Sequence, residues 1–198
     1  MRFMLWIDGV GGYLVCEGAT VTIGQPAPGS MVDVPVMADV SRRHAVIRRE
    51  GEHYVFDPQR PSRYADRAVA APVRLADGGI FELADEAGTG PMFRFALSRT
   101  YGNTARLDLV SRHRLQPHAD GVLLLADSCL IGPGDGDHIV APRWKRRVVL
   151  HRRSDGRLVF RTEGSYDVDG RKADGVAPIE RTSTIRGPDF AMRLEPIE

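Results

Sequence analysis

Four consecutive residues, Ser41-Arg42-Arg43-His44, combine side chains that can recognise a phosphate group. A serine hydroxyl and a guanidinium donate charge-assisted hydrogen bonds to phosphate oxygens, and backbone N–H groups of a loop can add further donors. An apolar segment, Ala45-Val46-Ile47, follows directly and is expected to be a strand. The polar residues would then occupy the loop at the start of that strand. The pattern therefore predicts a phosphate-binding loop.

The densest basic stretch lies within residues 143–153, where arginines and a lysine flank Trp144. Cations interleaved with an aromatic ring are typical of sites for single-stranded nucleic acid. The alternative is a strand edge whose charges face water and block edge-to-edge pairing. The net charge of the chain is only +1, which favours this alternative. Nucleic acid is therefore not the expected partner.

Signatures of metal binding and catalysis are missing from the sequence. The segment Gly134-Asp135-Gly136-Asp137 lacks the glutamate that ends a calcium-binding loop, so a turn without metal is predicted. There is no nucleophile elbow, no His-Glu-x-x-His and no pair of carboxylates beside a pocket pattern. We expect a protein that is not an enzyme, with no catalytic residues and no cofactor.

Short segments of alternating polarity dominate the chain and predict strands. Their residues are 13–16, 21–23, 44–47, 53–56, 80–83 and 93–97. Each is bounded by Gly, Pro or Asp, and no apolar stripe of helical length occurs. The 21 glycines and 13 prolines suit many turns. An all-β sandwich is predicted.

The chain also contains an internal repeat. Residues 12–24 and 121–132 match in pattern, and both end on Ile-Gly. Residues 45–56 similarly match residues 148–160. Each half closes on an apolar alternating segment, at 93–97 and at 190–194, and the polar segment 98–104 lies between the halves. Two tandem β-sandwich domains are predicted, one over residues 1–98 and one over residues 104–198.

The motifs of the first half follow a recognisable order. Their residues are Ile23-Gly24, Ser41-Arg42-Arg43-His44-Ala45, a predicted strand that ends at Asp57, and Leu75-Ala76-Asp77-Gly78. This order, which covers residues 12–97, resembles the signature of the forkhead-associated (FHA) domain family, bacterial type. The resemblance implies an antiparallel sandwich of the SMAD/FHA type that binds phosphothreonine peptides in kinase-linked signalling.

The resemblance also implies roles for single residues. Ser41 would donate to the phosphate, Arg42 would supply charge, and His44 would brace the loop without touching the ligand. The alternative for each is structural: Ser41 as a strand-entry residue, Arg42 as a solvated cation and His44 as a core imidazole.

The first half departs from the family pattern at two places. Gln25 stands where the family has an arginine that contacts the phosphate, and the loss of that charge is expected to weaken binding by about 1–3 kcal/mol. The family's Asn-Gly pair, which holds the peptide backbone, is replaced by residues 61–66. Within them Ser62 would offer a further hydroxyl, and Arg63 would replace part of the missing charge.

The second half departs further from the pattern. Alignment of the two halves places Trp144 opposite Ser41, and Arg147 opposite His44. Pro133 follows the second Ile-Gly, and Asp169 takes the place of the family's Asn, where its charge would repel a phosphate. We expect this half to keep an FHA-like fold but to lack the binding site.

Two cysteines, Cys16 and Cys129, lie far apart in apolar segments and are predicted to be buried free thiols in a reducing compartment. No apolar run approaches the roughly 18 residues that a membrane helix needs, and the N-terminus lacks the long apolar core of a signal peptide. A cytoplasmic protein without membrane contact is expected.

These observations lead to one functional hypothesis and two alternatives. The chain is expected to bind a phosphothreonine-containing protein, such as a substrate of a Ser/Thr kinase. The first alternative is an FHA-like scaffold or assembly protein that has lost phosphate binding. The second is nucleic-acid binding through residues 143–153.

Overall fold

The computed structural model describes residues 1–29, 32–84, 86–98 and 102–197. Within these ranges the protein is all-β: it contains 21 strands and no helix. In chain order the strands are β1 (Arg2–Ile7), β2 (Gly11–Cys16), β3 (Thr20–Gly24), β4 (Val34–Met37), β5 (Ala45–Glu50), β6 (His53–Pro58), β7 (Ser62–Tyr64), β8 (Arg67–Val69), β9 (Val73–Arg74), β10 (Ile80–Glu82), β11 (Met92–Leu97), β12 (Ala105–Leu109), β13 (Arg114–Leu115), β14 (Gly121–Leu124), β15 (Ser128–Gly132), β16 (Ile139–Val140), β17 (Val148–Arg152), β18 (Leu158–Val168), β19 (Arg171–Ile179), β20 (Thr184–Arg186) and β21 (Ala191–Pro196). Each segment that the sequence predicted as a strand coincides with or overlaps one of these.

The strands form two sheets. The larger has 15 strands in the order β16-β15-β17-β18-β20-β21-β1-β2-β14-β12-β11-β10-β7-β8, with β19 paired to β18. The smaller has the order β13-β4-β3-β5-β6-β9. Both sheets are mixed, because β2 and β14, β3 and β4, and β15 and β16 pair in parallel. The expectation of a purely antiparallel sandwich is corrected here: β3 and β4 are joined by a loop that returns the chain to the same end of the sheet.

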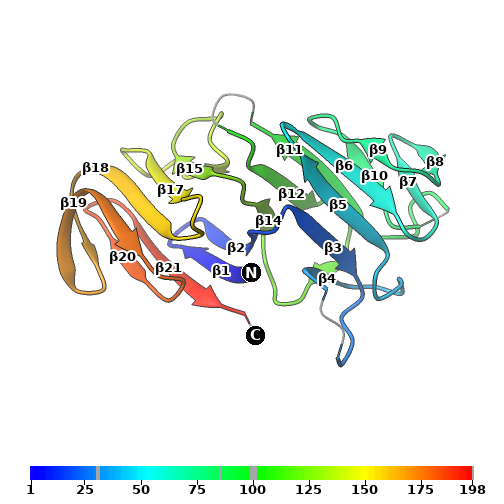
Figure 1. Cartoon of the computed structure of the whole chain (residues 1–198), viewed down its shortest axis with the longest axis horizontal. Helices are drawn as coiled ribbons and strands as arrows, with labels where there is room; N and C mark the ends of the chain where they lie inside the picture. The colour runs from blue at the N-terminus through cyan, green and yellow to red at the C-terminus, as the bar shows by residue number, and fades with distance from the viewer. Residues whose placement is uncertain (30–31, 85, 99–101, 198) are drawn as a thin grey trace.

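The strands β1, β2 and β14 lie in the middle of the molecule (Figure 1) and separate two hydrophobic cores. On β1, Phe3, Leu5 and Ile7 face what we call the second core, whereas Met4 faces the first core. The neighbouring strands alternate in the same way, with Tyr13, Val15, Leu123 and Leu125 on the side of the second core and Leu14, Cys16, Val122 and Leu124 on the side of the first. Successive side chains of a strand point to opposite faces, so one layer of backbone serves both cores.

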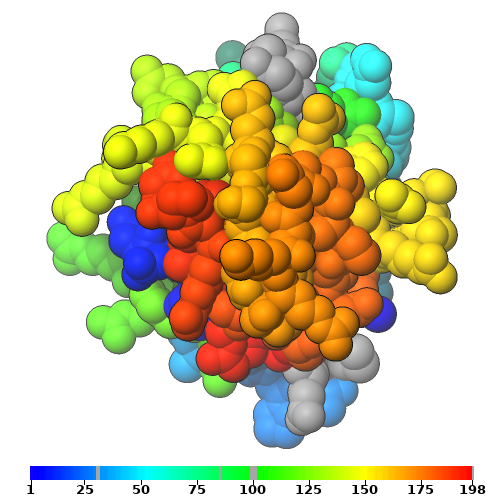
Figure 2. Space-filling view, turned by 90° about the vertical axis from the view of Figure 1, so that its left-hand side faces the viewer, coloured from blue at the N-terminus to red at the C-terminus, as the bar shows by residue number. Residues whose placement is uncertain are grey.

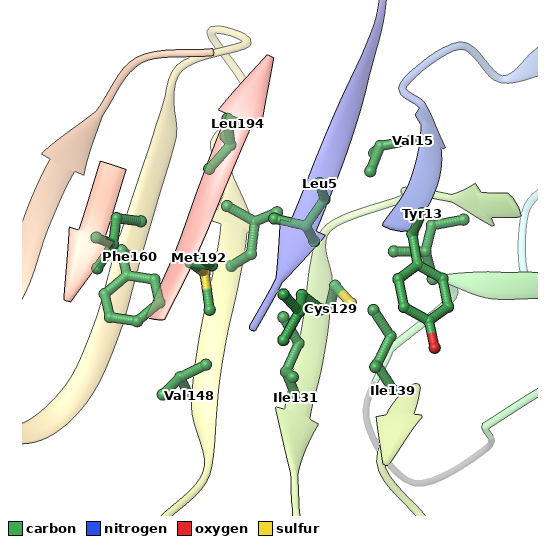
Figure 3. Close-up of a cluster of buried hydrophobic side chains, with 14 of the residues drawn as sticks. Leu5, Tyr13, Val15, Cys129, Ile131, Ile139, Val148, Phe160, Met192 and Leu194 are labelled. Atoms are coloured by element: carbon green, nitrogen blue, oxygen red, sulfur yellow. The ribbon is translucent and has the colours of Figure 1, made fainter. Parts of the chain in front are cut away.

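Each core is closed by the strands of its own half. In the first core the rings of Phe56, Phe81 and Phe93 stack in sequence, with centroids 4.6 and 5.3 Å apart. The second core is shown in Figure 3, where Leu5 from β1 lies among side chains from β15, β17 and β21. Figure 2 shows the molecule from the left-hand side of Figure 1, where the surface is formed mainly by the segments from β18 to β21.

The strand pairings recur in the two halves. β3 pairs in parallel with β4 and antiparallel with β5, which pairs with β6; β15, β16, β17 and β18 repeat this order. Single hydrogen bonds recur as well. The N–H of Thr22 donates to Oδ2 of Asp33 at 2.8 Å, and the N–H of Leu130 donates to Nδ1 of His138 at 3.0 Å. Asp33 and His138 each directly precede the parallel strand, so the sequence repeat has a counterpart in the fold.

Several pairings cross the predicted boundary between residues 98 and 104. β21 pairs with β1, β14 with β2, and β13 with β4. Leu115 and Val122 belong to the first core although they lie beyond the boundary. Residues 99–101 of the predicted junction lie outside the described residues. The division into domains 1–98 and 104–198 stays a prediction, and the shared strands argue against independent folding of the two parts.

The predicted buried free thiols are confirmed for Cys16 and Cys129. Desolvation by burial raises the pKa of each thiol to about 12, so neither forms a reactive thiolate near neutral pH. In the described part of the chain, no helical segment has the length and apolar character needed to cross a bilayer.

Candidate functional site: a cavity beside Ser41

The Ile23-Gly24 step packs directly beneath the loop that carries Ser41. The backbone N–H of Gln25 donates to the carbonyl of Ser41 at 3.1 Å. A Cβ added at Gly24 would lie 2.6 Å from that same carbonyl oxygen, which is closer than real Cβ atoms come. Glycine at position 24 is therefore required for the close approach of the two backbone segments, and this approach fixes the Ser41 loop against the end of β3.

His44 joins this loop to the loop between β6 and β7. Its Nδ1 accepts from the N–H of Ser41 at 3.4 Å, and its Nε2 lies 3.0 Å from the carbonyl of Pro61. A carbonyl only accepts, so Nε2 carries the proton and the ring is neutral. Burial lowers the pKa of His44; the Pro61 carbonyl opposes this effect, and the charge of Arg60 adds to it. Through these two contacts His44 connects the Ser41 loop to the β6–β7 loop.

A surface cavity of about 640 Å³ opens beside Ser41 and His44. Besides these two residues, its polar lining comes from Arg60 on the β6–β7 loop, Thr89 before β11 and His113 before β13. Ser41 is half-buried and Arg60 is exposed. Loops from four separate connections thus bring hydroxyl, guanidinium and imidazole groups to one hollow, an arrangement suited to an anionic ligand.

The cavity also contains one carboxylate, that of Asp39. Arg60 lines the same hollow, and Arg42 is exposed directly beside Ser41. The carboxylate of Glu82 also lies beside the cavity, because its Oε1 accepts from the N–H of the lining residue Gly90 at 3.2 Å. Two guanidinium groups and two carboxylates therefore stand around the cavity, and their charges balance.

The sequence-predicted site residues divide into two groups. Ser41 and His44 line the cavity, with Arg42 next to them, and Gln25 is exposed at the end of β3 where its backbone holds Ser41. Ser62 and Arg63 do not line this cavity. Their roles in ligand binding stay predictions.

Both side chains of the second group make contacts within the protein. Ser62 is only 1% exposed, and its hydroxyl donates to the carbonyl of Arg60 at 2.9 Å. The guanidinium of Arg63 donates to the carbonyl of Asp66 at 2.5 Å, across the β7–β8 turn. Ser62 therefore fixes the backbone at Arg60 instead of offering a free hydroxyl to the solvent.

Sequence reasoning missed four polar lining residues: Asp39, Arg60, Thr89 and His113. Arg60 has a detectable signal, because it is a cation between two prolines in a loop that follows a predicted strand. Thr89 and His113 have none, since each comes from a distant part of the chain and reaches the cavity only through the sheet order. The imidazole of His113 is held by the hydroxyl of Ser111, 2.9 Å from its Nδ1.

The corresponding place in the second half is filled by protein. Trp144, aligned with Ser41, is only 5% exposed, and its ring centroid lies 5.5 Å from that of Phe190. Arg147, aligned with His44, forms an ion pair with the buried carboxylate of Asp137 at 2.5 Å. The carboxylate of Asp169 accepts from the hydroxyl of Ser183 and from a backbone N–H, and so stabilises a turn.

Arg146 and Arg152 of the basic segment 143–153 contact the rest of the chain, whereas Arg143, Lys145 and Arg153 are exposed. Arg146 pairs with Asp189 at 2.9 Å, and Arg152 donates to the carbonyl of Glu17 at 2.9 Å. Trp144 lies in the second core, where its ring cannot stack on a base. Among the described residues, no group of three or more His, Cys, Asp and Glu side chains is placed to hold a metal ion.

No family model, curated protein or solved structure matches this chain. The resemblance to FHA domains therefore rests on the residues named above.

Proposed function

We propose that this protein is an FHA-like module that binds phosphothreonine-containing peptides in the cavity beside Ser41. The observation that carries the proposal is the position of Ser41. Ser41 lines a hollow that Arg60 also lines, and the backbone of Ser41 is held by His44 and Gln25. A phosphate group carries a charge of about −1.5 to −2 near neutral pH and offers three acceptor oxygens. Hydroxyl and guanidinium donors converge here on one volume large enough for it.

Arg60 supplies the charge that the family obtains from the position of Gln25. It lies on the β6–β7 loop, where it lines the cavity and its Nη1 donates to the carbonyl of Gln59 at 3.1 Å. Because Asp39 offsets part of this charge, we expect affinity below that of a site with an additional arginine. By family resemblance, the partner is a substrate of a Ser/Thr kinase in the cytoplasm of a bacterium.

The second half is proposed to be an FHA-like sandwich without a ligand site. The positions aligned with Ser41 and His44 hold the buried Trp144 and Arg147, which forms an ion pair with Asp137. This observation favours the scaffold role for that half, while the same buried indole disfavours nucleic-acid binding through residues 143–153. This half would contribute the strands that pair with β1, β2 and β4 of the first half.

An oriented phosphothreonine peptide library, screened against the intact chain, tests the proposal. We expect enrichment of a subset of peptides that disappears after treatment with a phosphatase. Enrichment that survives dephosphorylation would favour the scaffold alternative, and the absence of any enrichment would contradict phosphopeptide binding.

A further inference from the structure

An exposed tryptophan lies on a sheet face far along the chain from the Ser41 loop. Trp6 of β1 is 39% exposed, whereas Trp144 is 5% exposed. Trp6 is directly paired with Gly12 of β2 on one side and with Arg193 of β21 on the other, and Arg193 is paired with Thr184 of β20. Directly paired residues project from the same face of a sheet. These four residues therefore form one row on the face opposite the second core.

The indole of Trp6 lies flat on this face. A Cβ added at Gly12 would lie 2.6 Å from Cε3 of the ring, so the benzene end rests on the backbone of β2. At the other end, Nε1 donates to Oε2 of Glu195 on β21 at 3.0 Å. The ring therefore spans three strands, with one face against the sheet and the other toward solvent. Glycine at position 12 leaves the space that this orientation needs.

A hollow of about 690 Å³ surrounds the ring, and charges of both signs stand at its rim. Arg186 and Arg193 line it from β20 and β21, and Asp8 and Asp120 line it from the side of the β1–β2 turn. The carboxylate of Asp120 is fixed by the N–H of Gly12, which donates to it at 2.8 Å. Two guanidinium groups thus face two carboxylates, and Glu195 adds a third carboxylate at the indole nitrogen.

This balance of charge selects among ligand classes. A nucleic acid requires a surplus of cations around the aromatic ring, and two guanidinium groups beside three carboxylates do not supply it. The charges nearly cancel, so the hollow gives no strong attraction to a ligand with a high charge of either sign. A neutral sugar ring matches both features. It presents an apolar C–H face that can stack on the indole, and a rim of hydroxyls that donate to carboxylates and accept from guanidinium groups.

We propose that the outer face of β20, β21, β1 and β2 binds a neutral oligosaccharide, with the Trp6 indole as its stacking platform. Arg193, the cross-strand neighbour of Trp6, and Asp8 provide the hydrogen-bonding rim. The site is independent of the proposed phosphopeptide cavity, because the two hollows share no lining residue.

The test uses the intact chain and four neutral probes: cellohexaose, xylohexaose, maltohexaose and chitohexaose. Trp6 is the exposed one of two tryptophans, so acrylamide quenching of fluorescence reports mainly on it. We expect at least one hexasaccharide to reduce quenching at millimolar concentration or below, with an affinity that does not change between 50 and 500 mM salt (roughly a threefold change in screening length). This measurement needs no variant.

Variants then assign the platform by isothermal titration calorimetry. Trp6→Ala is expected to lower the affinity at least tenfold and Trp6→Phe less, while Asp8→Asn lowers it without removing the platform. Val176→Ala, at an exposed apolar residue on β19, is the matched control and should bind like the parent. The proposal is overturned if no hexasaccharide shields the indole, if Trp6→Ala binds as tightly as the parent, or if only heparin or polylysine protects the ring.

Discussion

Glu17 and Arg181 form a two-pronged ion pair that joins the two halves of the chain. Nε and Nη2 of Arg181 donate to the two carboxylate oxygens of Glu17, at 2.9 and 2.6 Å. Glu17 follows β2 and its side chain is only 3% exposed, whereas Arg181 lies between β19 and β20 and is 23% exposed. Its Nη2 also donates to the carbonyl of Gly156 at 3.0 Å. The turn after β2 is therefore bound to the connection between β19 and β20 in the second half.

Breaking this ion pair is expected to destabilise the whole protein. Glu17→Ala leaves the guanidinium of Arg181 partly buried without its partner, which should lower the free energy of unfolding by about 3 kcal/mol. Chemical denaturation with guanidinium chloride measures the change. Glu50→Ala, which removes an exposed partner of Arg48, serves as the control and should cost less than about 1 kcal/mol. Equal effects of the two substitutions would show that the buried pair does not stabilise the fold.

The shared strands predict that the chain unfolds as one unit. A fragment of residues 1–98 loses Ala105, Leu107, Leu115, Val122 and Leu124 from the first core. It also loses β12 and β14, which extend the sheet beside β11 and β2. We expect the fragment to be unfolded by circular dichroism and NMR, and the full chain to show a single transition. A well-dispersed NMR spectrum of the fragment would contradict the account and support independent domains.

Much of this fold could be predicted from the sequence. The strands β2, β3, β5, β6 and β11 alternate in polarity or are bounded by turn residues, and the repeat of Ile-Gly marks equivalent ends of β3 and β15. The strand β1 was not predicted, because residues 3–5 are buried on both faces and its run of apolar residues lacks period 2. The joining of the two halves could not be predicted either. It depends on the pairing of β1 with β21, which lies near the other end of the chain.

The candidate site could be predicted in its local part only. Ser41 and His44 are three residues apart, and their relation to Ile23-Gly24 follows from a motif. Thr89 and His113 reach the cavity through non-local pairings, of β10 with β7 and of β13 with β4, which no local pattern encodes. Ser62 was predicted as a ligand-binding hydroxyl because of its residue type, but its burial and its bond to Arg60 depend on how β7 packs.

Acidification is expected to destabilise the protein through His44. Burial lowers its pKa in the folded state, so the unfolded chain binds more protons between that lowered value and the ordinary value of about 6.5. The contribution of His44 is therefore complete above about pH 6.5 and is lost as the pH falls below it.

The measurement is the free energy of unfolding from pH 7.5 to pH 5.0, for the parent and for His44→Gln. The substitution should lower stability at pH 7.5 and reduce the slope with pH. The remaining slope would come in part from His138, whose pKa is also lowered by burial. An unchanged slope in His44→Gln would show that the imidazole does not remain neutral in the folded protein.

His113 is expected to contribute to ligand binding although it lies beyond the predicted first domain. It lines the cavity and is positioned by Ser111. His113→Ala should weaken binding of a selected phosphopeptide severalfold, because it removes a polar group from the wall of the hollow. His118→Ala is the matched control, because this exposed histidine lies on the next connection, between β13 and β14, and outside the cavity lining. Equal affinities of the two variants, measured by fluorescence anisotropy, would remove His113 from the site.

The central claim is that Ser41 contacts a phosphate, and one calorimetric comparison tests it most directly. The intact chain, Ser41→Ala and Ser154→Ala are titrated with a library-selected phosphothreonine peptide and with its unphosphorylated twin. Ser154 is an exposed serine in the β17–β18 turn, far along the chain from the cavity. Loss of the Ser41 hydroxyl should cost about 1.5–3 kcal/mol, which is roughly a 10- to 150-fold loss of affinity for the phosphorylated peptide. Ser154→Ala should bind like the parent, and the unphosphorylated twin should bind to none of the three. A folded Ser41→Ala protein that binds the phosphopeptide as tightly as the parent would contradict the account.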